Sequence, residues 1–294
     1  MNDTFLLIIS MAACLSGAVL KKVLSDKYES GNFVNHIYNA VVSIVSALCL
    51  LAVSSINTVS VFTVLLGLAF GLVTALQSIM FLKALEHGPF SYTSVIMSLS
   101  TIIPALSGAI FWQEVIAPVQ YVGIALMMAC FVLSVDTKGE KKKATAKWII
   151  YSAIAFVCTG AIGVMQKLHQ SSEYKMELDV FLVIAFSFSF VYSLVNIFIL
   201  KDKKQTKSEK PSVLTLLPII LMVVSGIAVA ANNKLNLYLS GVMDSAVFFP
   251  IVNGGHLVLT TICALLFFIE KLTAKQWVGM ILGIVSVVLL CNPF

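Results

Sequence analysis

Two segments of the chain repeat one pattern: TIIPALSGAIFWQEVIAPVQYVGIALMMACFVLS at residues 101–134 and LVLTTICALLFFIEKLTAKQWVGMILGIVSVVLL at residues 257–290. They align without a gap at an offset of 156 residues, and in each an apolar run, a polar turn and a second apolar run follow one another. Leucine and valine match by chance in any two apolar helices, but charged, amide and glycine positions rarely do. Those matching positions are Glu114/Glu270, Gln120/Gln276 and Gly123/Gly279. The shared register therefore predicts an internal repeat.

The composition of the chain around these segments excludes a water-soluble fold. Hydrophobic residues make up 59% of the 294 residues and charged residues only 11%, whereas soluble domains carry about 25% charged residues. The mean hydropathy is +0.99. A membrane span needs about 20 apolar residues. Apolar windows of about this length fall at 4–20, 33–53, 59–82, 91–113, 118–135, 147–168, 178–200, 213–237, 244–269 and 275–291.

These windows predict an all-α integral membrane protein in the lipid bilayer. Backbone groups must be paired inside the hydrocarbon, and the short alternating segments of a membrane barrel are missing from the sequence. We expect ten transmembrane helices arranged as two inverted five-helix repeats, because an odd number of spans makes the second repeat enter from the opposite face. Residues 1–135 form the first repeat, residues 136–146 a basic linker, and residues 147–294 the second repeat.

The positions of the basic residues predict the orientation. All nineteen are lysines, and sixteen of them lie in connectors that follow odd-numbered windows. By the positive-inside rule these connectors face the cytoplasm and both termini lie outside, in the cell membrane. We read the apolar start of the chain as the first membrane helix, since no basic residue precedes it as a signal peptide requires.

Polar residues recur at helical spacing in several windows, in both halves of the chain. Such stripes indicate helix faces turned toward a bundle interior, and together they predict a hydrated cleft. The alternative is that these side chains only hydrogen-bond neighbouring helices. The stripes are Ser10, Cys14, Gly17 and Lys21; Asn35, Asn39, Ser43 and Ser46; Thr74, Gln77 and Ser78; Thr159, Gly163, Gln166 and Gln170; Asn232, Asn233 and Asn236; and Asn253, His256 and Thr260.

The positions of the ionisable residues limit which side chains could carry protons across the membrane. All fourteen carboxylates lie in connectors or near span ends, which disfavours a carrier built on a buried acid and leaves His256 as the candidate proton carrier. We expect Lys22 and Lys167 to snorkel to the headgroups. We also expect Glu114 and Glu270 to fix the turns in which they lie.

Prolines and glycines predict local features of the helices. Pro118 suits a first helical turn, and Pro104 and Pro250 are expected to kink their spans. The pairs Gly67/Gly71 and Gly279/Gly283 allow close helix approach, with homodimer formation as the minor alternative.

Several classes of function are disfavoured. Without arginine, the chain lacks the bidentate group that nucleic-acid binding favours. The six cysteines lie in apolar runs without metal-ligand spacing, so we expect no metal and no cofactor. A membrane-embedded enzyme using His36, His169 and His256 has no HExxH or Ser/His/Asp pattern behind it, so we expect the protein not to be an enzyme.

The segment 104–133 and its second copy, ending in Glu270, Gln276, Trp277 and Gly279, resemble the drug/metabolite transporter superfamily, EamA type. Nearly the whole chain takes part in the resemblance, including the small-residue runs CLSGAVLKK (14–22) and CTGAIGVMQK (158–167). Gln113 and Ile269 stand where that family has glycine.

The resemblance implies a secondary transporter that moves a small metabolite, such as an amino acid, or a drug by alternating access, with export as the expected direction. It implies a central cavity whose substrate-binding residues map to Gln77, Tyr92, Gln166, Asn232, Asn233, Asn253 and His256. A carrier for phosphorylated or lipid-linked sugars is the alternative within transport, although no arginine and few lysines are available to neutralise phosphate. A non-transporting membrane subunit is the alternative outside it.

Overall fold

The structure is a computed structural model that describes residues 3–54, 59–88, 90–134, 145–200, 211–267 and 273–291. Within these ranges the secondary structure is entirely helical. The α-helices are α1 (Asp3–Lys27), α2 (Asn32–Val53), α3 (Val61–His87), α4 (Phe90–Leu99), α5 (Ile102–Phe111), α6 (Pro118–Ser134), α7 (Ala146–Gln170), α8 (Leu178–Leu200), α9 (Leu216–Val242), α10 (Ser245–Phe267) and α11 (Ala274–Cys291), with a 3-10 turn at Lys175–Glu177 before α8.

The helices follow the predicted apolar windows closely. Nine windows each coincide with one helix, and the window 91–113 is divided between α4 and α5. Six helices are long and apolar enough to cross a membrane: α1, α2, α3, α7, α9, and α8 together with the turn before it. The chain is therefore an all-helical protein of the multi-pass membrane type. Most of the predicted linker, residues 136–146, lies outside the described residues.

Side chains and proline determine where several helices begin. The Thr63 N–H donates to the hydroxyl of Ser60 at 3.1 Å, and the Trp148 N–H donates to that of Thr145 at 3.2 Å. Each bond satisfies one of the backbone donors that a helix start leaves unpaired. Helix α6 begins at Pro118, as predicted, because the first turn does not need that residue's missing N–H.

The break between α4 and α5 follows from Pro104. Proline has no N–H to donate to the carbonyl of Ser100. The Ile103 N–H donates to that carbonyl instead, at 3.0 Å, and the Thr101 N–H donates to the carbonyl of Ser98 at 3.2 Å. These i→i−3 bonds tighten the backbone and interrupt the α-helix. The predicted disturbance at Pro104 is thus confirmed, whereas α10 continues without interruption through Pro250.

Glycines let α3 approach α8 closely, as the Gly67/Gly71 pair predicts. A Cβ on Gly71 would collide with the backbone carbonyl of Ala185, and one on Gly67 would lie 3.2 Å from the carbonyl oxygen of Phe181. Phe70, between the two glycines, is fully buried and packs edge-on against Phe181 with ring centroids 5.0 Å apart. Backbone proximity and aromatic packing together hold this part of the bundle.

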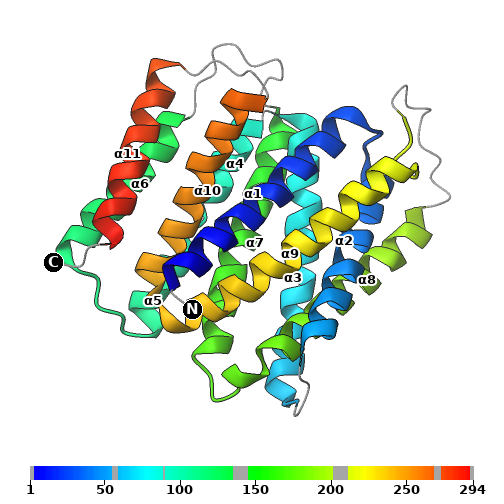
Figure 1. Ribbon diagram of the computed structural model, residues 1–294, viewed down its shortest axis with the longest axis horizontal. Coiled ribbons are helices and arrows are strands. Elements are labelled where there is room, and N and C mark those ends of the chain that lie inside the picture. Colours follow the sequence, from blue (N-terminus) through cyan, green and yellow to red (C-terminus); the bar gives the residue numbers. More distant parts are fainter. Residues whose placement is uncertain are drawn as a thin grey trace.

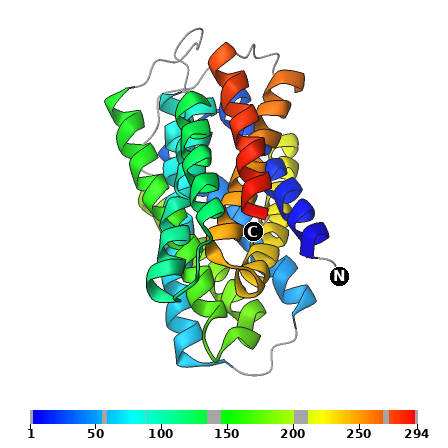
Figure 2. The same cartoon turned by 90° about the vertical axis from the view of Figure 1, so that its left-hand side faces the viewer.

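Helices from the two halves of the chain interleave. Helix α6 packs against α11 and helix α2 against α8. Both views show α6 and α11 side by side (Figures 1 and 2), and Figure 1 shows them at the edge of the bundle opposite to α8. Between these edges α3 packs against α7 and α8, α1 against α9 and α10, and α5 against α10 and α7. The space that these inner helices surround holds the candidate site.

Candidate functional site

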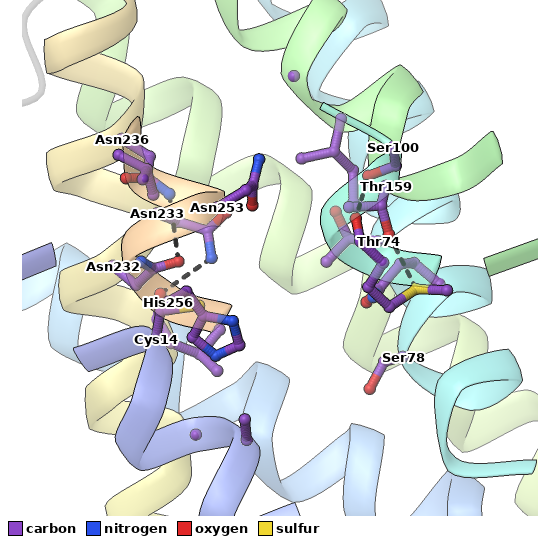
Figure 3. A pocket seen from close by; sticks show the side chains of 18 of the residues that line it. Cys14, Thr74, Ser78, Ser100, Thr159, Asn232, Asn233, Asn236, Asn253 and His256 are labelled. Carbon is purple, nitrogen blue, oxygen red and sulfur yellow. Dashed lines mark hydrogen bonds between the residues drawn. The ribbon is translucent and has the colours of Figure 1, made fainter. Parts of the chain in front are cut away.

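A cavity of about 240 Å³ lies between α1, α2, α3, α7, α9, α10 and the break that separates α4 from α5. Its volume is somewhat below the range of about 300–1,000 Å³ that is typical of pockets for drug-sized ligands, so it suits a smaller organic molecule. Both halves of the chain contribute side chains to it. The close-up shows polar groups on two facing walls (Figure 3).

Amide and imidazole groups make up one wall, which we call the amide wall: Asn232, Asn233 and Asn236 of α9 with Asn253 and His256 of α10. Two of its amides are tied to α1. Asn232 donates its side-chain N–H to the carbonyl of Ser10 at 3.0 Å, and the hydroxyl of Ser10 donates to Asn236 Oδ1 at 2.5 Å. Asn232 and Asn236 are thereby held in fixed orientations, as a binding surface requires.

Hydroxyl groups make up the opposite wall, which we call the hydroxyl wall: Thr74 and Ser78 of α3, Ser100 at the helix break and Thr159 of α7. Thr159 donates its hydroxyl to the carbonyl of Ala155 at 2.7 Å, a bond within its own helix. The two walls differ in chemistry, because amides offer rigid paired donors and acceptors whereas hydroxyls rotate to suit a partner.

The structure brings together six of the seven predicted site residues. Gln77, Gln166, Asn232, Asn233, Asn253 and His256 all line the cavity. The side chain of Tyr92, the seventh, lies outside the described residues, although its backbone belongs to α4. Their contact with a substrate stays a prediction, since position alone does not test it.

Phenylalanines are among the lining residues that the sequence interpretation missed. Phe81, Phe186, Phe248 and Phe249 all reach the cavity. The sequence has 19 phenylalanines, and they follow the same helical spacing whether they face lipid, a neighbouring helix or a cavity. No sequence signal separates these four from the rest.

In helix α2 the polar stripe hydrogen-bonds a neighbouring helix, which is the alternative interpretation of such stripes. Asn39 donates to the hydroxyls of Ser189 and Ser193 at 3.1 and 2.8 Å, and Ser43 lies 2.9 Å from the Ser189 hydroxyl. Asn39 and Ser43 border the cavity, but both are almost fully buried. These side chains are occupied in joining α2 to α8, so this stripe contributes chiefly to helix association.

Lys21 of α1 is the lysine among the described lining residues. Its ammonium lies 3.4 Å from the hydroxyl of Ser78. It also lies 5.7 Å from the ring centroid of Tyr38 and 5.5 Å from that of Phe81, distances at which aromatic faces attract a cation. Among the described residues no carboxylate forms an ion pair with it.

Lys167 of α7, outside the cavity, is compensated by the chain itself. Its ammonium lies 2.6 Å from Oε1 of Glu114, and both side chains are almost entirely buried. It also donates to the carbonyl of Met243 at 3.1 Å. Glu114 accepts from the backbone N–H and the hydroxyl of Ser245 at 2.7 and 3.1 Å. The ion pair therefore joins the end of α5, α7 and the α9–α10 turn.

At this ion pair one expectation is wrong and another is incomplete. Lys167 does not snorkel to the headgroups, because the carboxylate of Glu114 provides a stronger interaction inside the protein. Glu114 does more than hold its own turn, since it contacts residues of the second half of the chain. Within the described residues no three His, Cys, Asp or Glu side chains are grouped closely enough to hold a metal ion.

Comparison with known proteins is informative for the fold alone. No protein-family model matches the chain, and no curated protein matches its sequence significantly. Among solved structures 28 chains match. One, known only as a crystal structure of a protein, superimposes with a TM-score of 0.70 over 97% of this chain and 98% of its own, at 14% sequence identity. The chain therefore has a helical fold that also occurs in a protein of known structure.

Proposed function

We propose that this protein is a secondary transporter that carries a small organic molecule across the membrane by alternating access through the central cavity. The observation that carries the proposal is a cavity with polar side chains on two facing walls, lined by helices from both halves of the chain that are mostly apolar. Polar groups deep among membrane helices mark substrate pathways, because placing them there is costly unless they serve a ligand or each other.

The packing of the helices supports two inverted five-helix repeats. Taking α4 and α5 as one span gives ten spans, five in each half. When each helix is replaced by its counterpart in the other half, the α1–α9 contact corresponds to α7–α3 and the α2–α9 contact corresponds to α8–α3. All four of these contacts are present. The contacts α2–α8, α5–α10 and α6–α11 map onto themselves. Inverted repeats of this kind place the substrate site at their interface.

The surface supports a bilayer around these helices. Large apolar side chains are exposed on the outer faces, among them Leu65 of α3, Val157 of α7 and Phe198 of α8. With the lysine-rich odd connectors on the cytoplasmic side, both termini lie outside the cell membrane. The resemblance to the EamA-type drug/metabolite transporters agrees with this arrangement and favours export of a metabolite such as an amino acid.

Flux into sealed vesicles tests the proposal. Purified protein in liposomes should exchange radiolabelled amino acids and organic acids faster than empty liposomes, with uptake that saturates. Two tryptophan substitutions on α7 provide a matched pair. T159W fills the cavity and should abolish exchange, whereas V157W places the same side chain on the exposed face and should retain it.

The outcome also separates the alternatives. Chemical conversion of a solute without its passage would favour a membrane enzyme. The absence of solute flux in vesicles that contain correctly folded protein would favour a non-transporting subunit. Equal flux in T159W and wild type would show that transport, where present, does not use this cavity.

A further inference from the structure

The charge of the cavity points to the class of ligand. Its described lining includes Lys21 and no carboxylate. The groups near the Lys21 ammonium, a serine hydroxyl and two aromatic rings, attract a cation without neutralising it. An ammonium away from bulk water is unfavourable unless a negative charge opposes it.

A second lysine of this protein shows how the chain compensates an ammonium that has a structural role. Lys167 is paired with Glu114 at 2.6 Å and hydrogen-bonded to the carbonyl of Met243. Lys21 has no comparable carboxylate among the described residues. A molecule that enters the cavity can therefore supply the negative charge that opposes the Lys21 ammonium.

The remaining lining describes the rest of that molecule. Met97, Ile162 and Val229 line the cavity with partly exposed apolar side chains, whereas Phe186 and Phe248 border it almost fully buried. The side-chain amides of Gln77 and Asn253 have no hydrogen bond to any described residue, so they are free to bind polar groups of a ligand.

We propose that the cavity binds a small organic monoanion whose carboxylate pairs with the Lys21 ammonium and whose apolar body lies against the partly exposed apolar side chains of the lining. The inference rests on the proposed function and names the substrate class for the same site. A phosphate monoester fits less well, because it carries a charge of about −1.5 to −2 at neutral pH and a single lysine would leave much of that charge uncompensated.

Three probes of the same shape but different charge test this inference: 3-phenylpropionate, 3-phenylpropanamide and 3-phenylpropan-1-amine. Affinity is measured for the purified full-length protein, as the dependence of its thermal stability on ligand concentration. The carboxylate should bind about tenfold to a hundredfold more tightly than the amide, as expected for a hydrogen bond between charged groups. The amine should bind more weakly than either.

Two lysine substitutions test whether Lys21 causes the preference for carboxylate over amide. K21M should remove the preference for carboxylate over amide and leave affinity for the amide within about threefold, since only the charged contact is lost. K83M is the matched control. The Lys83 ammonium also lies over an aromatic ring, 5.4 Å from the centroid of Tyr151, but Lys83 does not line the cavity. K83M should retain the wild-type preference.

Three outcomes would overturn the inference. They are equal affinity for carboxylate and amide in the wild type, no binding of the carboxylate, and a preference for carboxylate that survives in K21M. Binding that depends on Lys21 but is accompanied by no flux in vesicles would uphold the anion site and count against transport. The failures of the two proposals are thus distinguishable.

Discussion

Lys21 and Lys167 occupy similar places in the two halves of the chain but differ in what surrounds them. Each lies near the C-terminal end of the first helix of its half, α1 or α7. Lys167 has a carboxylate at 2.6 Å. Lys21 has a hydroxyl at 3.4 Å and two ring faces. A charge that the chain neutralises serves stability, and a charge that it leaves open is available to a ligand.

The difference extends to the cavity walls. The hydroxyl wall, on the side of α7, includes a broken helix, where Pro104 interrupts hydrogen bonding. The amide wall, on the side of α1, includes the unbroken helix α10. Similar helix packing in the two halves therefore supports different local chemistry, and substitutions at the two lysines should separate the structural role from the ligand-binding one.

The largest expected effect on stability is that of K167M. It leaves the Glu114 carboxylate buried without its cation, which typically costs about 3–5 kcal/mol. The free energy of unfolding, measured by denaturant titration in mixed micelles, should fall by about that amount. K21M should change it by less than about 1 kcal/mol, because no described carboxylate loses a partner.

A double variant provides the control for this prediction. In K167M/E114Q the buried carboxylate is replaced by a neutral amide, so a large part of the lost stability should return. If K167M is as stable as the wild type, or if the double variant is the least stable of all, the ion pair does not have the structural role assigned to it.

The sequence predicted the helices well because hydropathy depends on local composition. Predicted and observed boundaries agree within a few residues for most windows, and α6 begins at Pro118 as expected. The break at Ser100 and Thr101 was predicted only as a disturbance near Pro104. Pro104 determines that the carbonyl of Ser100 loses its donor, but whether the helix bends or breaks there depends on the i→i−3 bonds that the neighbouring N–H groups form.

The ion pair could not be predicted in the same way. Glu114 and Lys167 come from different halves of the chain, and only tertiary packing brings α5, α7 and the α9–α10 turn together. The polar stripes show the same limit. Spacing shows that Asn39 and Ser43 share a face, as Asn232 and Asn236 do. It does not show that the first pair is hydrogen-bonded to α8 and the second to α1, although all four side chains border the cavity.

A medium effect is expected from G108A, which disturbs the ion pair without removing a charge. A Cβ at this position would collide with Oε2 of Glu114 and would lie 2.7 Å from the Cβ of Ser245. The carboxylate must then move away from Lys167, at a cost of about 1–3 kcal/mol. Thermal unfolding of the purified variant measures the loss.

G17A is the matched control for that prediction. Both glycines lie inside helices, but the nearest atom to a Cβ on Gly17 is a methyl carbon of Val229 at 4.0 Å. G17A should be neutral or slightly stabilising, since alanine favours the helix by about 1 kcal/mol. Equal destabilisation by both substitutions would point to a general need for glycine and away from Glu114.

The smallest effect is expected from S78A, which removes the hydroxyl near Lys21. At 3.4 Å this hydrogen bond is long, so its contribution lies at the weak end of the usual range. The ammonium would be less well positioned, and affinity for 3-phenylpropionate should fall only about twofold to threefold, with unchanged thermal stability. S78T keeps the hydroxyl and should bind like the wild type. If S78A instead weakens binding as much as K21M does, the hydroxyl contacts the ligand directly, and the anion site is shared by α1 and α3 rather than centred on the lysine.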